Sequence, residues 1–479
     1  MPRARLLDLV RGECDLSEFG RAGGVIVQSS IKSGTNQFHG SAFEFARSSL
    51  FDASPNYRFE GAGVAPVLPF KRNTFGGSFG GPILRNRLFI FGDYQGLREN
   101  QPLNPEIITV PTALMRRGNF TELLGQGTTI APSCVTSAHP VNGAIYDPST
   151  CAQFAGNIIP TSRQNPAAVN YLNAYPLPNV PGLLNGTQNN YRTIRSDIRQ
   201  FNTFDARLDY RIAAADQFFV RFSYDNSVFN RTSRLPLLPA GFASGANTTH
   251  ARGYVAGETH TFTANLLNEL HVGYNRYTFA NTPVFSGQPI SANLGIVNAN
   301  RTPLLGGGAL IGGFNNELEY TGDYGTYSVP ENMYQINDAV TFIHHNHTFK
   351  FGGSGIRRDV AFFRPIAGKG FFQIANGDFT GYQVSELLAG FVDNYSIGAQ
   401  NGFFGTRNYE IGAFAQDDWK LNNRLTLNLG FRYDLITFPT EEHNRQAALN
   451  PTTGTIDLAG VNGVRAASSI PTTKTSLLA

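Results

Sequence analysis

The chain has 479 residues, with 51 Gly, 38 Phe and 19 Tyr against only 3 Met and 1 Trp, and 15% charged residues, where a soluble domain has roughly 25%. A net charge of +3 without a Lys/Arg block excludes a phosphate-binding stripe for nucleic acid, and no window offers the roughly 18 apolar residues of a membrane-spanning helix. Aromatics, glycine, few charges and a mean hydropathy of −0.20 favour strands with one apolar and one polar face.

The first 36 residues are expected to precede the first strand. The opening stretch, MPRARLLDLVRGECDLSEFG, contains basic residues but no apolar run of signal-peptide length. A β-barrel precursor must cross the inner membrane and should carry a signal, so we expect the front of the protein to be missing. Residues 1–16 are left unassigned.

The first strands are predicted over residues 37–47, 71–84 and 86–98. Within the second, Gly76, Ser78 and Gly80 fit the G-x-S-x-G pattern of a hydrolase nucleophile elbow. That elbow requires a strand, a sharp turn and a helix, whereas strand-like sequence lies on both sides here. Glycines that allow close packing in a strand account for the pattern better, so we predict no enzyme and no catalytic residue.

A long connection is predicted over residues 99–198. Connections of this length usually hold structure of their own and serve a function, and we expect short helices in TALMRRGNF and NPAAVNYLNAY. Cys134 and Cys151 lie in its polar part. They could form a disulfide if this connection lies outside the cell, where conditions are oxidising, and two free thiols are the alternative.

Strands over 199–213 and 215–229 alternate apolar and charged side chains. Because an Arg or Lys facing lipid at the bilayer midplane costs about 2–4 kcal/mol, we predict that the charged face lines the lumen of a barrel. There the charges would pair across strands and contact other parts of the protein, a structural role before a ligand-binding one. The predicted lumen-facing charges include two from a later strand: Asp205, Arg207, Asp209, Arg211, Arg221, Asp225, Arg432 and Asp434.

Four more strands are predicted over 250–263, 266–280, 331–344 and 346–361. Gly306–Gly308 precede no Lys of a phosphate-binding loop, so a flexible loop is expected there. His344, His345 and His347 fall in a predicted tight turn. No Cys or acidic cluster in the sequence accompanies them to complete a metal site, so we predict a polar turn, with no metal and no cofactor.

The last strands are predicted over 407–421 and 423–438, followed by a polar tail from 441 to 479. From Arg424 to Asp434, Leu425, Leu427, Leu429, Phe431 and Tyr433 alternate strictly with polar residues. Strict alternation over this length suits a tilted membrane crossing of about 9–11 residues.

The connections alternate between short and long along the chain. Short turns near 82–87, 213–217, 264–268, 344–347 and 421–424 alternate with connections of roughly 20 to 100 residues. Outer-membrane barrels place short turns in the periplasm and long loops outside. The sequence therefore predicts an all-β fold: an antiparallel transmembrane β-barrel fragment, an open half-barrel of about eleven strands with long extracellular loops.

Several stretches, in order along the chain, resemble the TonB-dependent receptors of the Oar-like group. SEFGR leads into GGVIV and KSGTNQFHG, which is similar to the end of the family's plug domain and its first barrel strand. NTFGGSFGGPILRNRLFIFGDYQGLRE, VPTALMRRGNF and YEIGAFAQDDWKLNNRLTLNLGFRYD resemble later parts of the barrel. Family members have a barrel of roughly 22 strands around a plug, so about half of the strands are expected here.

The resemblance implies a division of the chain and a function. Residues 17–36 would be the end of the plug, 37–440 the first half of the barrel, and 441–479 a loop or tail. The intact protein would sit in the bacterial outer membrane, in contact with its lipid, and take up a large or scarce solute with energy delivered by the TonB complex. The TonB-contacting segment is not expected in this chain, the solute is not identified, and no nucleic acid is expected as a partner. A passive porin-like channel and a surface adhesion or structural barrel are the alternatives.

Overall fold

The computed structural model describes residues 17–18, 20, 30–52, 68–126, 132–135, 141–238, 244–312, 317–322, 325–365, 367–374, 377–398, 402–445, 447–450 and 453–461. The unassigned residues 1–16 and most of the predicted polar tail lie outside these residues. In the described part of the chain, no helix is long and apolar enough to cross a membrane.

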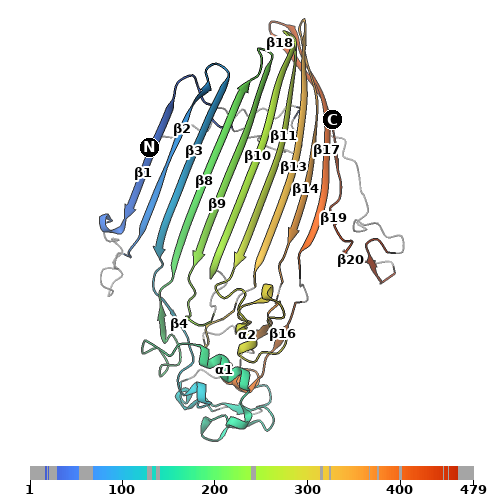
Figure 1. Ribbon diagram of the computed structural model, residues 1–479. Helices are drawn as coiled ribbons and strands as arrows, with labels where there is room; N and C mark the ends of the chain where they lie inside the picture. Colours follow the sequence, from blue (N-terminus) through green and yellow to red (C-terminus); the bar gives the residue numbers. More distant parts are fainter. Residues whose placement is uncertain are drawn as a thin grey trace.

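One antiparallel sheet of twelve strands dominates the described structure (Figure 1). Eleven long strands follow one another in chain order, and the short β19 (Thr440–Glu441) pairs with β17. Each predicted strand has an observed counterpart, which confirms the predicted fold class. The long strands are β1 (His39–Ser48), β2 (Lys71–Leu84), β3 (Leu88–Pro102), β8 (Ser196–Arg211), β9 (Asp216–Arg231), β10 (Gly245–Thr263), β11 (Leu266–Thr282), β13 (Tyr327–His344), β14 (His347–Phe362), β17 (Phe404–Asn422) and β18 (Leu425–Ile436).

The sheet is a meander, so its connections alternate between two ends. The short turns gather at one end, drawn at the top of Figure 1, and the long connections gather at the other. Asn86 (φ 63°) and His345 (φ 52°) adopt the left-handed conformation that tight turns between strands require. The predicted sorting of connections by length is therefore present.

Four long connections fold together into a cap at the loop end of the sheet. They are residues 103–195, 232–244, 283–326 and 363–403, as far as these are described. The buried apolar side chains come almost entirely from them, and Phe120, Leu172, Leu235, Ile311 and Leu388 belong to one cluster. The sheet is a single layer and contributes little to this core, unlike the sheets of a soluble sandwich.

The cap contains short helices and small sheets. The predicted helix in NPAAVNYLNAY is α1 (Pro166–Ala174), which begins at Asn165, whose side chain accepts from the N–H groups of Ala167 and Ala168. The helix α3 (Gln383–Ala389) was missed. It ends at Gly390, whose φ of 83° suits glycine. The other cap helices are α2 (Ile290–Asn293), η2 (Met115–Arg117, in the predicted TALMRRGNF), η3 (Thr121–Leu123), η4 (Ala155–Asn157), η5 (Thr161–Arg163) and η6 (Pro303–Leu305).

Three small sheets join parts of the cap. The strand β12 (Leu310–Gly312) lies parallel to β15 (Phe371–Gln373), which pairs with β16 (Asn394–Ser396), so two long connections share one sheet. The remaining short elements are β4 (Glu106–Ile108) with β7 (Tyr191–Thr193), and β5 (Tyr146–Asp147) with β6 (Ala152–Gln153). Outside the cap lie η1 (Ser49–Phe51) and β20 (Ala447–Leu449) with β21 (Ile456–Leu458).

The main sheet is open. Within the described residues, β1 pairs only with β2, and β18 pairs along its length only with β17. The first and last predicted strands are therefore its two edges, as an open half-barrel requires.

Candidate functional site

The two faces of the sheet are distinguished by the segment of residues 17–36. The face that contacts this segment is called the inner face, and the opposite one the outer face. At one end of the segment, Arg432 on β18 donates hydrogen bonds to the carbonyl oxygens of Ser17 (3.3 Å) and Glu18 (2.8 Å). Ser17 Oγ donates to Gln416 Oε1 on β17 (3.0 Å), and Lys350 on β14 forms an ion pair with Glu18.

The other end of the segment lies against the first strands of the sheet. Arg207 on β8 donates to the carbonyl oxygen of Ile31 (3.1 Å), and Ser33 Oγ donates to Asp209 Oδ2 (2.7 Å). A Cβ at Gly34 would come within 2.5 Å of the carbonyl oxygen of Ile90, so only glycine fits this close approach. The described parts of residues 17–36 thus contact β14, β17 and β18 at one end and β3 and β8 at the other.

The strand register places all eight predicted lumen-facing charges on the inner face. The first group lies on β8 and β9, where Arg207 is directly opposite Arg221 and Asp205 is opposite Ser223. The second is Arg432 with Asp434 on β18, joined at 2.8 Å. Arg207 with Asp209 (2.7 Å) and Arg432 with Asp434 each hold one end of residues 17–36. Lys350 and Gln416 were missed, although the alternation in HTFKFGG and FAQDD places them on the same face.

An ion network ties three parts of the cap together. Arg234 donates to Glu106 Oε2 (2.6 Å) and to Glu319 Oε1 (2.8 Å), and Arg195 pairs with the same Glu106. Burial raises the pKa of the Glu106 carboxyl, but the hydrogen bonds and charges of Arg195 and Arg234 more than offset this and lower it. For Glu319, burial dominates and raises the pKa although Arg234 opposes it. The network fixes how these connections sit on one another.

Two carboxyls are buried at α3, Glu386 within the helix and Glu317 against its first residue. Glu317 accepts a hydrogen bond from the backbone N–H of Gln383 (2.8 Å), and burial raises its pKa to about 8, with Glu386 adding to the rise. Glu386 accepts from the backbone N–H groups of Phe379 (2.7 Å) and Thr380 (3.2 Å), yet burial still raises its pKa. The sequence analysis named neither carboxyl, since their burial depends on how distant connections pack.

Cys134 and Cys151 are brought together in the cap. Both are free thiols in the structure, and contact with the Cys134 thiol raises the pKa of Cys151. The disulfide predicted between them stays a prediction, but the two side chains are neighbours.

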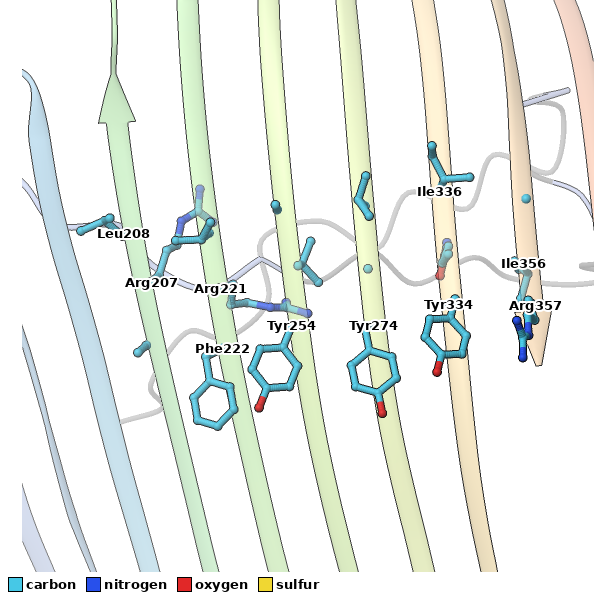
Figure 2. A pocket seen from close by; sticks show the side chains of 18 of the residues that line it. Arg207, Leu208, Arg221, Phe222, Tyr254, Tyr274, Tyr334, Ile336, Ile356 and Arg357 are labelled. Atoms are coloured by element: carbon cyan, nitrogen blue, oxygen red, sulfur yellow. The ribbon is translucent and has the colours of Figure 1, made fainter. Parts of the chain in front are cut away.

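The outer face carries a row of aromatic rings across successive strands (Figure 2). Phe222, Tyr254, Tyr274 and Tyr334 lie directly opposite one another on β9, β10, β11 and β13. The ring centroids of Phe222 and Tyr254, and of Tyr274 and Tyr334, are 5.0 Å apart. Arg357 on β14 continues the row, with its guanidinium 5.4 Å from the centre of the Tyr334 ring.

A shallow apolar groove of about 860 Å³ lies along this row. Its floor consists of Leu208, Val220, Ala256, Val272, Ile336 and Gly355, which the register places one row nearer the short turns than the rings. Ala256 has only a methyl group and Gly355 has no side chain, which leaves space in this row.

The candidate motifs named from the sequence lie in ordinary strand and turn positions. Gly76, Ser78 and Gly80 lie inside β2, with strand on both sides. His347 contacts Asp417 (2.8 Å) and stacks on Trp419 at 5.1 Å. Gly306 ends η6, and Gly307 follows it with a φ of 114°.

A group that the sequence analysis missed is Asp216, Glu258 and His260 at the short-turn end, whose candidate ligand atoms lie within 4.8 Å of one another. The imidazole of His260 is paired with Asp216, and Glu258 is exposed. Pairing of these side chains with one another explains their proximity without a metal ion.

This chain is similar to known outer-membrane proteins. Residues 30–477 match the family model described as outer membrane beta barrel domain. The chain is 24% identical over 456 residues to the TonB-dependent transporter Oar of Myxococcus xanthus, an alignment that covers 88% of this chain and 38% of that protein.

Two solved structures align with most of this chain. The outer membrane transporter YddB from Escherichia coli has a TM-score of 0.47 at 12% identity, over 89% of this chain and 43% of that one. The siderophore receptor PirA from Acinetobacter baumannii has a TM-score of 0.41 at 10% identity, over 87% and 42%. The chain therefore spans less than half the length of each of these proteins.

Proposed function

This chain belongs to the outer-membrane β-barrel domain family, and from that premise we propose that it forms the barrel wall and extracellular cap of a transporter that takes up a large or scarce solute with energy from TonB. The predicted resemblance to Oar-like TonB-dependent receptors and the outer-membrane location are confirmed. The curated relative is a transporter, in agreement with the prediction that this chain is not an enzyme.

The observation that carries the proposal is the contact of residues 17–18 and 30–36 with the inner face. The two stretches are held by Arg432 and Lys350 on one side and by Arg207 and Asp209 on the other. Contacts of two described stretches with the inner side of the wall are what a plugged, gated barrel needs. A passive porin-like channel has no use for them, so this feature favours the transporter over that alternative.

We infer that residues 17–36 are the last part of a plug and residues 37–440 the wall around it. The inner-face charges then serve to seat the plug, with ligand contact a second role. The folded cap supports capture of the solute from outside, because its core fixes the positions of four connections.

The proposal is tested with the protein expressed in an outer membrane from its complete gene. Cells with and without the gene are grown in a mixed medium, and solutes removed from the medium are identified by mass spectrometry. Depletion of a specific solute that stops when TonB is deleted is the expected result. Depletion that is independent of TonB would identify a passive channel, and binding of cells or matrix without depletion would identify an adhesion protein.

The seating role is tested by conductance in planar bilayers bathed in KCl. The double variant Arg207→Ala/Arg432→Ala should open a steady current, because both ends of the internal segment lose their guanidinium anchors. A matched control is Arg424→Ala in a short turn, which should leave the barrel closed. If the two variants conduct equally, Arg207 and Arg432 do not hold the internal segment in place.

A further inference from the structure

We propose that the outer face holds a lipid of the outer leaflet whose headgroup carries a phosphate monoester, with the phosphate on Arg252 and Arg276 and an acyl chain in the apolar groove on the short-turn side of the aromatic row. The proposal concerns the face turned away from residues 17–36 and does not depend on which solute is transported.

Arg252 and Arg276 are directly opposite each other on β10 and β11. They stand on the same face as Tyr254 and Tyr274 and one row closer to the loop end of the sheet. Both guanidinium groups are exposed. Like charges placed directly opposite on a sheet repel each other, so this pair is costly unless an anion lies between them.

No carboxylate of the described residues neutralises this pair. Arg276 donates to the amide oxygen of Asn332 (3.2 Å), which also accepts from Tyr274 Oη (2.9 Å). The acid in the same row is Asp359, and it is already paired with Arg357 (2.8 Å) and Arg407 (2.7 Å). The row therefore has an excess of guanidinium groups, which bind phosphate through two parallel hydrogen bonds.

The order of rows along the strands matches the order of groups in a lipid. Along the strands, from the loop end toward the short turns, the two arginines come first. The aromatic row follows, and then the groove floor with Val220, Ala256 and Val272. Tyrosine side chains sit at the level of lipid headgroups, with apolar side chains facing the acyl chains. Figure 2 shows the rings of Tyr254, Tyr274 and Tyr334 side by side. Their hydroxyl ends point toward the loop end, where the headgroup would lie.

Charge decides which lipid fits. A zwitterionic headgroup brings its own cation next to Arg252 and Arg276, whereas a phosphate monoester brings up to two negative charges and no cation. A guanidinium pair is therefore expected to select the monoester, and the groove alone would accept any acyl chain.

The experiment uses the protein made from its complete gene, purified in detergent and mixed with equal amounts of bisphosphorylated lipid A and phosphatidylcholine. Retained lipid is measured by native mass spectrometry. We expect lipid A to be retained in preference to phosphatidylcholine. The double variant Arg252→Gln/Arg276→Gln should lose about tenfold or more of that retention, because charge-assisted hydrogen bonds are removed. The control Arg424→Gln, an exposed arginine in a short turn, should retain lipid A like the unaltered protein.

A second variant tests the groove separately. Ala256→Phe fills the hollow without changing charge, and it should weaken retention of lipid A while inorganic phosphate remains a poor competitor. Heat-modifiable migration on gels verifies that each variant is folded. Equal retention of the two lipids, unchanged retention in the double arginine variant, or full displacement by millimolar inorganic phosphate would each overturn the proposal.

Discussion

Single charged side chains show how burial and pairing act differently in the two parts of this protein. On the inner face, Arg207 and Arg432 each have a carboxylate two residues away on the same strand and a backbone carbonyl of residues 17–36 as a further acceptor. In the cap, Glu317 and Glu386 are buried with backbone N–H groups as their hydrogen-bond donors. The first set has its hydrogen-bonding groups satisfied by partners on the inner face, whereas burial raises the pKa of the second set.

The first prediction concerns Glu317, whose folded pKa of about 8 lies above its ordinary value of 4.5. A raised pKa means that the folded cap binds the proton more tightly than the unfolded chain does. Its contribution to stability is therefore present below about pH 4.5 and lost as the pH rises through 8. Hydrogen exchange of residues 377–390 should be slower at pH 5.5 than at pH 8.5, after correction for the intrinsic pH dependence of exchange.

The variant Glu317→Gln should flatten this dependence, because the amide cannot ionise but still accepts from Gln383. The difference at pH 8.5 is expected on the order of 4 kcal/mol, at about 1.4 kcal/mol for each pKa unit. Glu442 directly follows β19, outside the cap, and is exposed, so Glu442→Gln is the control variant. A pH dependence that persists unchanged in Glu317→Gln would show that Glu386 or another group is responsible.

The second prediction is that Cys134 and Cys151 form a disulfide once the cap is outside the cell. Their thiols are already in contact, and closing a loop of this length restricts the unfolded chain. Peptide mapping without reductant should recover the two cysteines in one linked fragment, and Cys151→Ser should make the cap more sensitive to protease. Two free thiols in protein taken from the cell surface would contradict the prediction.

At the scale of elements, alternation along each strand assigns its two faces. On β18 the even-numbered residues share the face of Arg432 and Asp434, and Leu425, Leu429, Phe431 and Tyr433 are exposed on the other. A shift of one residue in the pairing with β17 would move every charge to the lipid side. Alternation therefore excludes a shift of the register by one residue.

The third prediction places spin labels at Leu427 and Asn428, neighbours on β18 with opposite directions. In membranes, the label at 427 should be accessible to oxygen dissolved in lipid, and the label at 428 to a water-soluble nickel chelate. The same pattern is expected at Leu429 and Gly430, which serve as the matched pair. Equal accessibility within a pair would mean that the strand is not lipid-facing on one side.

For the whole molecule, the open sheet is the decisive feature. Both edge strands, β1 and β18, run toward the loop end, because they are the first and last of eleven long antiparallel strands, with ten reversals of direction from one to the other. Direct pairing of β1 with β18 would therefore be parallel, which is unusual in these barrels. In lipid, an unpaired backbone group costs several kcal/mol, so both edges require antiparallel partners.

The fourth prediction is that these 479 residues by themselves do not close into a transport-competent barrel. We expect aggregation or degradation on refolding into liposomes, with no heat-modifiable band on unheated gels. Protein made from the complete gene is the comparison and should give that band. A compact, heat-modifiable 479-residue species with specific uptake would refute the prediction.

The sequence by itself determined the strands, their faces and the sorting of connections by length. These depend on alternation and on turn residues, which are local properties, so Leu425 to Tyr433 could be assigned to one face without any coordinates. The resemblance added the family and the expectation that residues 17–36 lie inside the wall.

Only the tertiary structure decided the rest, because the remaining features join residues far apart in the chain. Glu106, Arg234 and Glu319 meet because separate connections fold into one cap, and Lys350 meets Glu18 across 332 positions. The pair of Arg252 and Arg276 depends on the register between two strands, which alternation alone leaves free to slide by two residues. Burial, long-range pairing and register are collective properties of the packed chain, and no local pattern in the sequence encodes them.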